Sequence, residues 1–307
     1  MSTAIRLGTR ASQLATTQSQ WVARRIEALS GRPVQLVRIA SEGDRTSASL
    51  ASLGGTGVFA TALREALLTG ECDVIVHSLK DLPTAAAPGL VIGAIPEREP
   101  ANDALCAERY GSLNELPHGA RVGTGSPRRV AQLLQARPDL RVMDIRGNVD
   151  TRLGKVSSGE VDAVVLAEAG LRRIGRTDAI AEVFALAAVP TSAGQGALAV
   201  EVREGDETML EILGRLTHPE AHRAALLERA VLANLEAGCA APVGISVVDG
   251  QLIAEVYALD GQRSVRAERA LGAREFDRAL ATELVEELIA NGAAEIAPLS
   301  PGGASRG

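Results

Sequence analysis

The sequence predicts an α/β protein made of several domains. Its 307 residues are long for one hydrophobic core, so two or three domains are expected. Short apolar strands alternate with helical segments over the first two-thirds of the chain, and residues 73–76 are almost continuously apolar, as in a parallel strand covered on both faces. From about residue 217 a helix, strands near 245–258 and 264–271, and a helix at 274–290 predict a small α+β domain.

The composition is that of an ordinary soluble globular protein, with 46% hydrophobic and 23% charged residues. No apolar run is long enough to cross a membrane, and the first residues run directly into a strand pattern instead of a signal segment, so a cytoplasmic protein is expected. The net charge of −6 argues against a general nucleic-acid binder. Arginines clustered locally in an acidic protein indicate instead a positive pocket for a small polyanion.

The three cysteines are Cys72, Cys106 and Cys239. They form no CxxC pair and no Cys/His spacing typical of a metal site, so neither a metal nor a disulfide framework is expected. Cys72 lies at the head of the apolar strand at residues 73–76 and Cys106 beside Ala104 and Leu105, so both are expected in the core. Cys239 lies on a short loop bounded by glycine and proline, where a cysteine is either presented to a ligand or an inert small hydrophobic residue.

The first region begins with a strand at residues 5–9, a helix that continues to residue 29, and a strand at residues 34–39. Arg10 and Ser12 lie at the turn from the first strand into the helix. Ligands of open α/β sheets bind beyond the carboxyl ends of the strands, and helix N-termini favour anions, so this turn is a candidate anion site. Alternatively, Ser12 only caps the helix and Arg10 is solvated.

Residues 42–57 form a polar loop, either a lid or a surface excursion, and residues 58–68 form a helix. The buried strand at 73–76 ends in polar residues, at the place where ligands bind in such sheets. These residues are His77, Ser78, Lys80 and Asp81. A solvated turn with an internal Lys80–Asp81 pair is the alternative.

A charged, proline-bounded segment at residues 96–100 is expected to link the first region to the second. There a strand ends at Thr124 and a helix begins, with Ser126 suited to the N-cap and a proline to the first helical position. Arg128 and Arg129 follow, so two guanidinium groups and free backbone N–H groups meet at one helix start. This is a natural site for a carboxylate or a phosphate. The sequence lacks the Gly-Lys-Ser/Thr ending of a nucleotide-binding P-loop.

Further arginines stand at or near later strand ends. Strands are expected at residues 140–145 and 161–167, and Arg146, Arg152 and Arg173 follow them. The forked N–H donors of arginine match a carboxylate better than the single ammonium of lysine does. Together with the three arginines named above, these residues indicate a ligand rich in carboxylates.

Two features point to the domain organisation. Residues 69–76 resemble residues 158–165, since each segment follows a helix and begins a buried strand. Two half-similar α/β domains would explain this echo, and so would ordinary helix–glycine–strand punctuation. Residues 189–200 are interpreted as a crossing segment that ends in a strand.

Six motifs follow one another along the chain: LGTRAS at residues 7–12, VHSLKDLP at 76–83, GTGSPRR at 123–129, RGNV at 146–149, GQGA at 194–197 and EAGC at 236–239. In this order they closely resemble the porphobilinogen deaminase (hydroxymethylbilane synthase) family. The resemblance extends over nearly the whole chain, and six ordered motifs are far more specific than any single short pattern.

The resemblance implies an α/β fold of three domains. The first two are expected to resemble the lobes of type II periplasmic binding proteins, and the third is expected to be a small α+β domain that carries the cysteine. The implied division is a discontinuous first domain of residues 1–97 plus 197–215, a second domain at 101–190, a third at 217–300, and a disordered tail at 301–307.

The resemblance also implies a cytoplasmic, monomeric transferase of tetrapyrrole and heme biosynthesis. Four porphobilinogen molecules are expected to condense head to tail into linear hydroxymethylbilane, with release of ammonia and catalysis by Asp81. A dipyrromethane cofactor, built from the substrate, is expected on Cys239 through a thioether. The other implied cofactor-binding residues are Ser78, Lys80, Asp81, Thr124, Ser126, Arg128, Arg129, Arg146 and Gly147. The implied substrate-binding residues are Arg10, Ser12, Phe59, Arg152, Arg173 and Gln195.

This chemistry fits the residue types. Each pyrrole unit bears two carboxylates, so a growing chain needs many bidentate cations. Loss of ammonia leaves an electron-poor azafulvene that the carboxylate of Asp81 can stabilise. One departure is the run GGTGVF at residues 54–59, where the family often carries a lysine, so a lysine contact from this loop is in doubt. The alternative function is a non-enzymatic two-lobed module that binds a small carboxylate and needs no cysteine.

Overall fold

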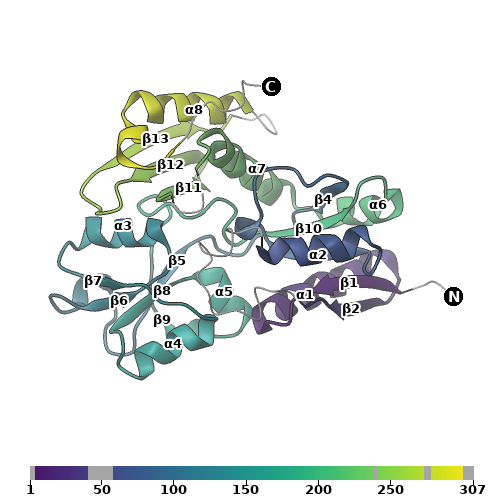
Figure 1. The fold of residues 1–307 in the computed structure, drawn as a ribbon, viewed down its shortest axis with the longest axis horizontal. Helices are drawn as coiled ribbons and strands as arrows, with labels where there is room; N and C mark the ends of the chain where they lie inside the picture. Colours follow the sequence, from purple (N-terminus) through teal and green to yellow (C-terminus); the bar gives the residue numbers. More distant parts are fainter. Residues whose placement is uncertain (1–3, 41–57, 238–240, 273–277, 300–307) are drawn as a thin grey trace. The chain divides into compact units, whose positions relative to one another are not determined.

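The computed structural model describes residues 4–40, 58–237, 241–272 and 278–299, with only the backbone of Val58 and Phe59. The chain divides into two compact units (Figure 1). Unit 1 comprises Met1–Glu99 and Gly196–Arg223, and unit 2 comprises Pro100–Gln195 and Ala224–Gly307. The three-domain boundaries given above stay a prediction. Within the described ranges, no helix combines the length and the apolar character that a membrane span requires.

Unit 1 is built on a five-stranded sheet with the order β2-β1-β3-β10-β4. The first three strands in this order are parallel, and β10 runs antiparallel to both of its neighbours. Because β10 comes from the returning chain, this sheet is completed only after the excursion into unit 2. The strands are β1 (Ile5–Thr9), β2 (Val34–Arg38), β3 (Val74–Ser78), β4 (Leu90–Ala94) and β10 (Leu198–Arg203).

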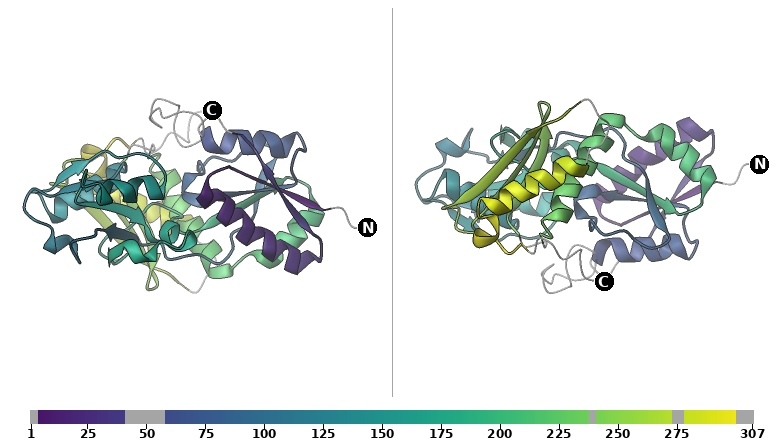
Figure 2. Two further views of the ribbon diagram at one scale, coloured as in Figure 1. Left: turned by 90° about the horizontal axis from the view of Figure 1, so that it is seen from below. Right: turned by 90° about the horizontal axis from the view of Figure 1, so that it is seen from above.

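Helices cover both faces of this sheet, α1 and α6 on one and α2 on the other (Figure 2). Val74 of β3 packs in the cluster with α1 and α6, and the next residue, Ile75, packs in the cluster with α2. Burial on both faces explains the continuous apolar run of β3. The elements are α1 (Gln13–Ser30), α2 (Val58–Leu68), α6 (Glu207–Leu216) and the 3₁₀ turn η2 (Leu79–Asp81).

Unit 2 contains a second five-stranded sheet, with the order β7-β6-β8-β5-β9. Its first three strands are parallel, and β5 is antiparallel to β8 and β9. Neither β5 nor β9 was predicted from the sequence, because each has only four residues. The strands are β5 (Asp103–Cys106), β6 (Arg121–Gly123), β7 (Arg141–Met143), β8 (Ala163–Ala167) and β9 (Ile180–Val183). The helical elements are η3 (Leu113–Glu115), α3 (Pro127–Ala136), α4 (Val149–Ser157), α5 (Glu168–Arg173) and η4 (Thr177–Ala179).

The two sheets have one plan. In each, three parallel strands are followed by an antiparallel strand from a distant part of the chain and then by an outer strand. The similar segments at residues 69–76 and 158–165 lead into β3 and β8, which hold the same position in this order. The shared topology favours two half-similar α/β domains over chance punctuation.

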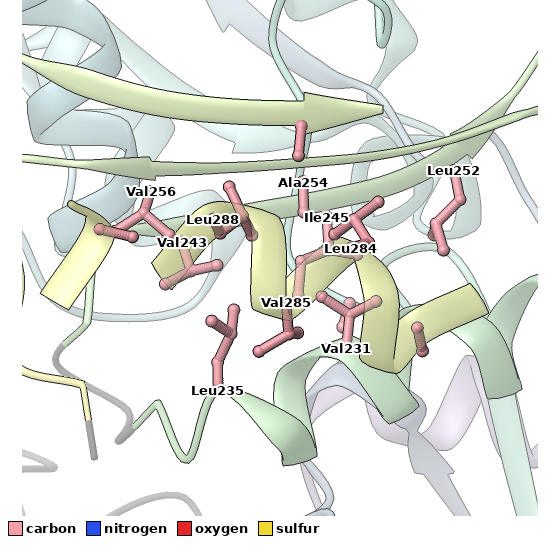
Figure 3. Packing of buried hydrophobic residues seen from close by; sticks show 14 of the residues in the cluster. Val231, Leu235, Val243, Ile245, Leu252, Ala254, Val256, Leu284, Val285 and Leu288 are labelled. Atoms are coloured by element: carbon pink, nitrogen blue, oxygen red, sulfur yellow. The ribbon is translucent and has the colours of Figure 1, made fainter. Parts of the chain in front are cut away.

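A three-stranded antiparallel sheet, with the order β11-β12-β13, completes unit 2. The strands of this sheet are β11 (Val243–Val248), β12 (Gln251–Tyr257) and β13 (Ser264–Ala270). The remaining helices are α7 (Pro219–Asn234), which belongs to unit 2 from Ala224 on, α8 (Arg278–Ala290) and α9 (Ala293–Ile296). Figure 3 shows Leu284 of α8 beside Ile245 of β11, and Leu288 of α8 beside Val243 of β11, in one buried cluster. The predicted fold class, two α/β sheets and a small α+β domain, is confirmed.

Cys72 and Cys106 lie in the core, as expected, with at most 1% of their surface exposed. Burial raises the pKa of the Cys72 thiol to about 11 and that of Cys106 to about 12. Both side chains are therefore inert packing groups near neutral pH.

Candidate functional site

In unit 1 the turn after β1 joins a buried strand end to a capped helix. Thr9 is 1% exposed, and Ser19 Oγ donates to Thr9 Oγ1 at 2.8 Å. Ser12 is the N-cap of α1, where its Oγ accepts from the backbone N of Ala15 at 3.3 Å. Arg10 is half-buried at the same turn. The expected cap is confirmed, and its hydroxyl proton is still available to a ligand because the cap uses only a lone pair.

The turn after β3 lies at the same end of the sheet, because β1 and β3 are parallel neighbours. Gln18 Nε2 donates to Ser78 Oγ at 3.0 Å. Leu79 is fully buried, and its backbone N–H donates to the segment that leads into β10. This anchor leaves Lys80 half-buried and Asp81 exposed. The turn therefore presents a carboxylate on a rigidly held strand end.

A buried ionic cluster lies within the same sheet. Glu201 of β10, whose side chain is 3% exposed, accepts from Arg64 Nε at 2.9 Å and Nη2 at 2.7 Å. His77 Nε2 lies 3.1 Å from Glu201 Oε2. Burial alone would raise the pKa of Glu201, but the close contacts with His77 and Arg64 lower it to about 2. His77, near the end of β3, thus belongs to this buried structural cluster.

In unit 2 the turn after β6 approaches the turn after β7. Ser126 is the N-cap of α3, and its Oγ accepts from the backbone N of Arg129 at 3.5 Å. Thr124 is 1% exposed, and its Oγ1 accepts from the backbone N of Ser126 at 3.3 Å. A Cβ on Gly125 would lie 3.0 Å from the carbonyl oxygen of Ile145. Glycine at this position therefore allows the two strand ends to meet.

Arg128 and Arg129 turn inward and share one carboxylate. Arg128 Nη1 donates to Asp103 Oδ2 at 2.8 Å, and Arg129 Nη2 donates to Asp103 Oδ1 at 2.6 Å. These three residues are between 1% and 7% exposed. Burial alone would raise the pKa of Asp103, but the two guanidinium groups outweigh it and hold the pKa well below its usual range. Two cations on one anion leave one positive charge in excess.

The excess charge is matched by unused donors. In the part of the chain that the structure describes, Arg128 Nε and Nη2 and Arg129 Nε are buried and have no hydrogen-bond partner. A buried, unpaired donor on a cation is costly unless a ligand completes it. The Nε and Nη2 groups of one guanidinium form a fork that fits the two oxygens of a carboxylate. The geometry therefore fits a carboxylate-bearing ligand.

Further arginines gather at this end of the second sheet. Arg152 Nε donates to the carbonyl oxygen of Gly147 at 2.8 Å. Burial, followed by the charges of Arg129 and Arg146, lowers the pKa of Arg152, so the three cations lie near one another. Arg146 is exposed and pairs with Asp144 at 3.2 Å. At position 147 a Cβ would lie 2.7 Å from Thr151 Cγ2, and φ is +113°, so only glycine fits there.

The remaining sequence-predicted residues are placed as follows. Gln195 is fully buried, and its Nε2 donates to the carbonyl oxygen of Ala101 and to Asp103 Oδ1, both at 2.8 Å. Arg173 is half-buried at the end of α5. Cys239, the loop at 42–57 and the side chain of Phe59 lie outside the described residues. The binding roles assigned to all of these residues stay predictions.

Sequence reasoning missed Asp103 and Glu201, the acids at the centre of the two buried clusters. Each had a signal. Glu201 is the single ionisable residue in the apolar run at 197–202, and Asp103 directly precedes the apolar run at 104–106. A lone acid in a buried strand requires a cation nearby, and only the fold shows which one.

Comparison with known proteins places the chain in a family. The family model described as "porphobilinogen deaminase, dipyromethane cofactor binding domain" matches residues 5–211. A second model, "porphobilinogen deaminase, C-terminal domain", matches residues 222–290. Porphobilinogen deaminase of Leifsonia xyli is 53% identical over 96% of this chain and 95% of its own length. The protein of the same name from Thermobifida fusca is 52% identical over 96% of both chains. Among solved structures, a periplasmic substrate-binding protein from Coxiella burnetii is 16% identical over 71% of this chain and 94% of its own, with a TM-score of 0.46.

Proposed function

Because this chain belongs to the porphobilinogen deaminase family, we propose that the strand-end residues of its two five-stranded sheets carry the family's reaction. The protein is a transferase, hydroxymethylbilane synthase. It condenses four porphobilinogen molecules head to tail into linear hydroxymethylbilane, releases ammonia and uses a dipyrromethane cofactor. The observation that supports the placement of the site is the buried cluster of Arg128 and Arg129 on Asp103, with its excess positive charge and unused donors.

The residues at this cluster suit a dipyrromethane, whose two pyrrole units bear four carboxylates. Arg128 and Arg129 would hold carboxylates from the base of the site, and Arg146 and Arg152 from its rim. The start of α3, capped by Ser126, adds backbone N–H groups. The bound cofactor supplies the nucleophilic pyrrole carbon to which substrate is joined. Cys239 is the proposed attachment residue.

Residues of unit 1 are proposed to act on the incoming porphobilinogen. When ammonia leaves, the C–N bond of the aminomethyl group breaks and positive charge develops on the pyrrole ring. Asp81, exposed at the turn after β3, stabilises this charge and exchanges a proton with the reacting groups. Arg10, Ser12, Ser78 and Lys80 lie on neighbouring strand ends and suit the substrate's carboxylates.

The protein is proposed to act as a monomer in the cytoplasm, without nucleic acid. The net charge of −6 offers no general attraction to nucleic acid. Cys72 and Cys106, buried as free thiols, suit a reducing compartment. Light scattering of the purified protein tests the monomer.

The deciding experiment is the intact mass of the purified protein, with peptide mapping. We expect an adduct of two linked pyrrole units on Cys239, together with ammonia release from porphobilinogen. Cys239→Ser should abolish both the adduct and turnover. An unmodified wild-type protein that does not consume porphobilinogen, but still binds a small carboxylate, would instead support a non-enzymatic binding module.

A further inference from the structure

Gln132 links the arginine pair to the third sheet. Its Oε1 accepts from Arg128 Nη1 at 2.7 Å. Its Nε2 donates to Tyr257 Oη at 2.9 Å and to the carbonyl oxygen of Pro190 at 2.8 Å. Gln132 is 9% exposed and Tyr257 is 1% exposed. One buried amide thus bridges a cation at the candidate site and a hydroxyl on β12, 125 residues further along the chain.

The hydrogen bonds of Arg128 are distributed unevenly. Nη1 faces three acceptors: Asp103 Oδ2, Gln132 Oε1 and, at 3.4 Å, the carbonyl oxygen of Pro190. Nε and Nη2 face none in the described residues. The acceptors among the described residues therefore all hold one corner of the guanidinium group. The opposite edge, the fork that a carboxylate would fill, is left unused.

Tyr257 is itself held firmly against α3. The hairpin that follows it reaches α3 at Gly261, where a Cβ would lie 2.6 Å from the carbonyl oxygen of Ala131. Burial, and then the nearby carboxylate of Glu255, raise the pKa of Tyr257, so the hydroxyl stays neutral. The donor-only guanidinium of Arg128 and the acceptor-only carbonyl of Pro190 set which way the amide of Gln132 points, and the fixed hydroxyl of Tyr257 adds a second acceptor on its N–H side.

We propose that Gln132 and Tyr257 are positioning residues that hold Arg128 by Nη1, so that its Nε–Nη2 edge receives a carboxylate of the bound oligopyrrole. This rests on the proposed function. The orientation of Arg128 then also depends on how the third sheet packs against α3, because Tyr257 belongs to β12. Without the bond to Tyr257 the amide keeps the carbonyl oxygen of Pro190 as an acceptor but loses its second anchor, so its oxygen is held less firmly against Arg128.

A second glutamine on α3 provides a matched control. Gln135 Nε2 donates to Ser264 Oγ at 3.0 Å and so also joins α3 to the third sheet. This bond is exposed. If such bonds only dock the two elements, removing either one should have the same kind of effect. If Gln132 and Tyr257 position Arg128, only their removal should alter carboxylate recognition.

The experiment compares Gln132→Met and Tyr257→Phe with Gln135→Met and Ser264→Ala. Thermal unfolding is measured first, then the rate at which the apoprotein gains the pyrrole adduct from porphobilinogen, followed by intact mass, and finally KM and kcat. We expect adduct formation to slow and KM to rise roughly tenfold in Gln132→Met and roughly threefold in Tyr257→Phe, since a hydrogen bond to a charged group is lost or loosened. Both control variants should match wild type.

Combining Gln132→Met with Tyr257→Phe should add little to Gln132→Met alone, because both act through one bond. The positioning role is overturned if the two pairs of variants show equal KM values and adduct rates, or if their losses only follow thermal stability. If the wild-type protein neither gains the adduct nor consumes porphobilinogen, the proposed function fails instead. The two failures are therefore distinguishable.

Discussion

The carboxylate of Asp73 binds both the backbone N–H and the guanidinium group of Arg6. Its Oδ2 accepts from the backbone N of Arg6 at 2.8 Å, and its Oδ1 accepts from Arg6 Nη2 at 2.6 Å. Asp162 binds Arg121 in the same way, at 2.8 Å and 3.1 Å. In each sheet the arginine lies near the start of the middle one of the three parallel strands, β1 or β6, and the aspartate directly precedes the neighbouring strand, β3 or β8. The repeated pair fixes the registration of the central strands and supports a common plan for the two sheets.

Asp162→Asn is predicted to lower stability at neutral pH but not in acid. The hydrogen bond from the Arg121 side chain is the main cause that lowers the pKa of Asp162 in the folded protein. The charged pair therefore stabilises the fold above the unfolded pKa of about 4, and its contribution is lost as the pH falls through the lower folded pKa. Urea unfolding at pH 7 and near pH 2 should show a difference between variant and wild type that shrinks in acid. A pH-independent difference would contradict this.

Arg64→Met is predicted to destabilise the protein by about 3 kcal/mol, because it leaves the carboxylate of Glu201 buried with His77 as its remaining partner. The pKa of Glu201, now about 2, should rise toward the ordinary range. Chemical denaturation gives the free energy of unfolding. Arg215→Met is the control: Arg215 makes an exposed contact to the carbonyl oxygen of Leu29, and its loss should change stability by no more than about 0.5 kcal/mol. Equal effects would rule out the buried ion pair as the cause.

Gly261→Ala and Gly250→Ala separate backbone strain from packing. The two glycines lie in hairpins of the third sheet with φ values of +72° and +73°. An alanine costs about 1–2 kcal/mol in this conformation. At position 250 nothing lies within 4 Å of the new Cβ, whereas at position 261 it meets backbone atoms of Ala131 and Gln135 at 2.6 Å. Gly261→Ala should therefore lower the melting temperature clearly more than Gly250→Ala.

Comparing Gly261→Ala with Gly250→Ala also tests the packing of the Tyr257 hairpin against α3. Because the hairpin must move away from α3 to admit a Cβ, Gly261→Ala should raise KM for porphobilinogen, and Gly250→Ala should not. Equal melting temperatures in the two variants would mean that the close approach to α3 is absent.

Asp81→Asn is predicted to lower kcat by about 10²–10⁴-fold, the usual range for the loss of a proton-transferring carboxylate. The change preserves size and falls on an exposed turn anchored by Leu79, so folding should be unaffected. Intact mass should still show the adduct on the protein, and single-turnover assays should show the slow step. Turnover at the wild-type rate would remove Asp81 from the mechanism.

The local features of the fold could be predicted from the sequence because their partners are near in the chain. Ser12 and Ser126 each cap the helix that follows them by accepting from a backbone N–H three residues further along. Gly31 ends α1 in the left-handed conformation. The apolar run of β3 indicated burial on both faces. The strand ends, and with them most of the candidate site, follow from these local rules and from the position of ligand sites in α/β sheets.

The tertiary structure alone decided which polar groups meet in the core. Asp103 lies 25 residues from Arg128 and 26 residues from Arg129, the hydroxyl bonded to Gln132 is 125 residues away from it, and Glu201 is 137 residues from Arg64. A buried charge must find a counter-charge, and the sequence states that requirement without naming the partner. The fold answers it, because strand order and helix packing determine which distant side chains become neighbours.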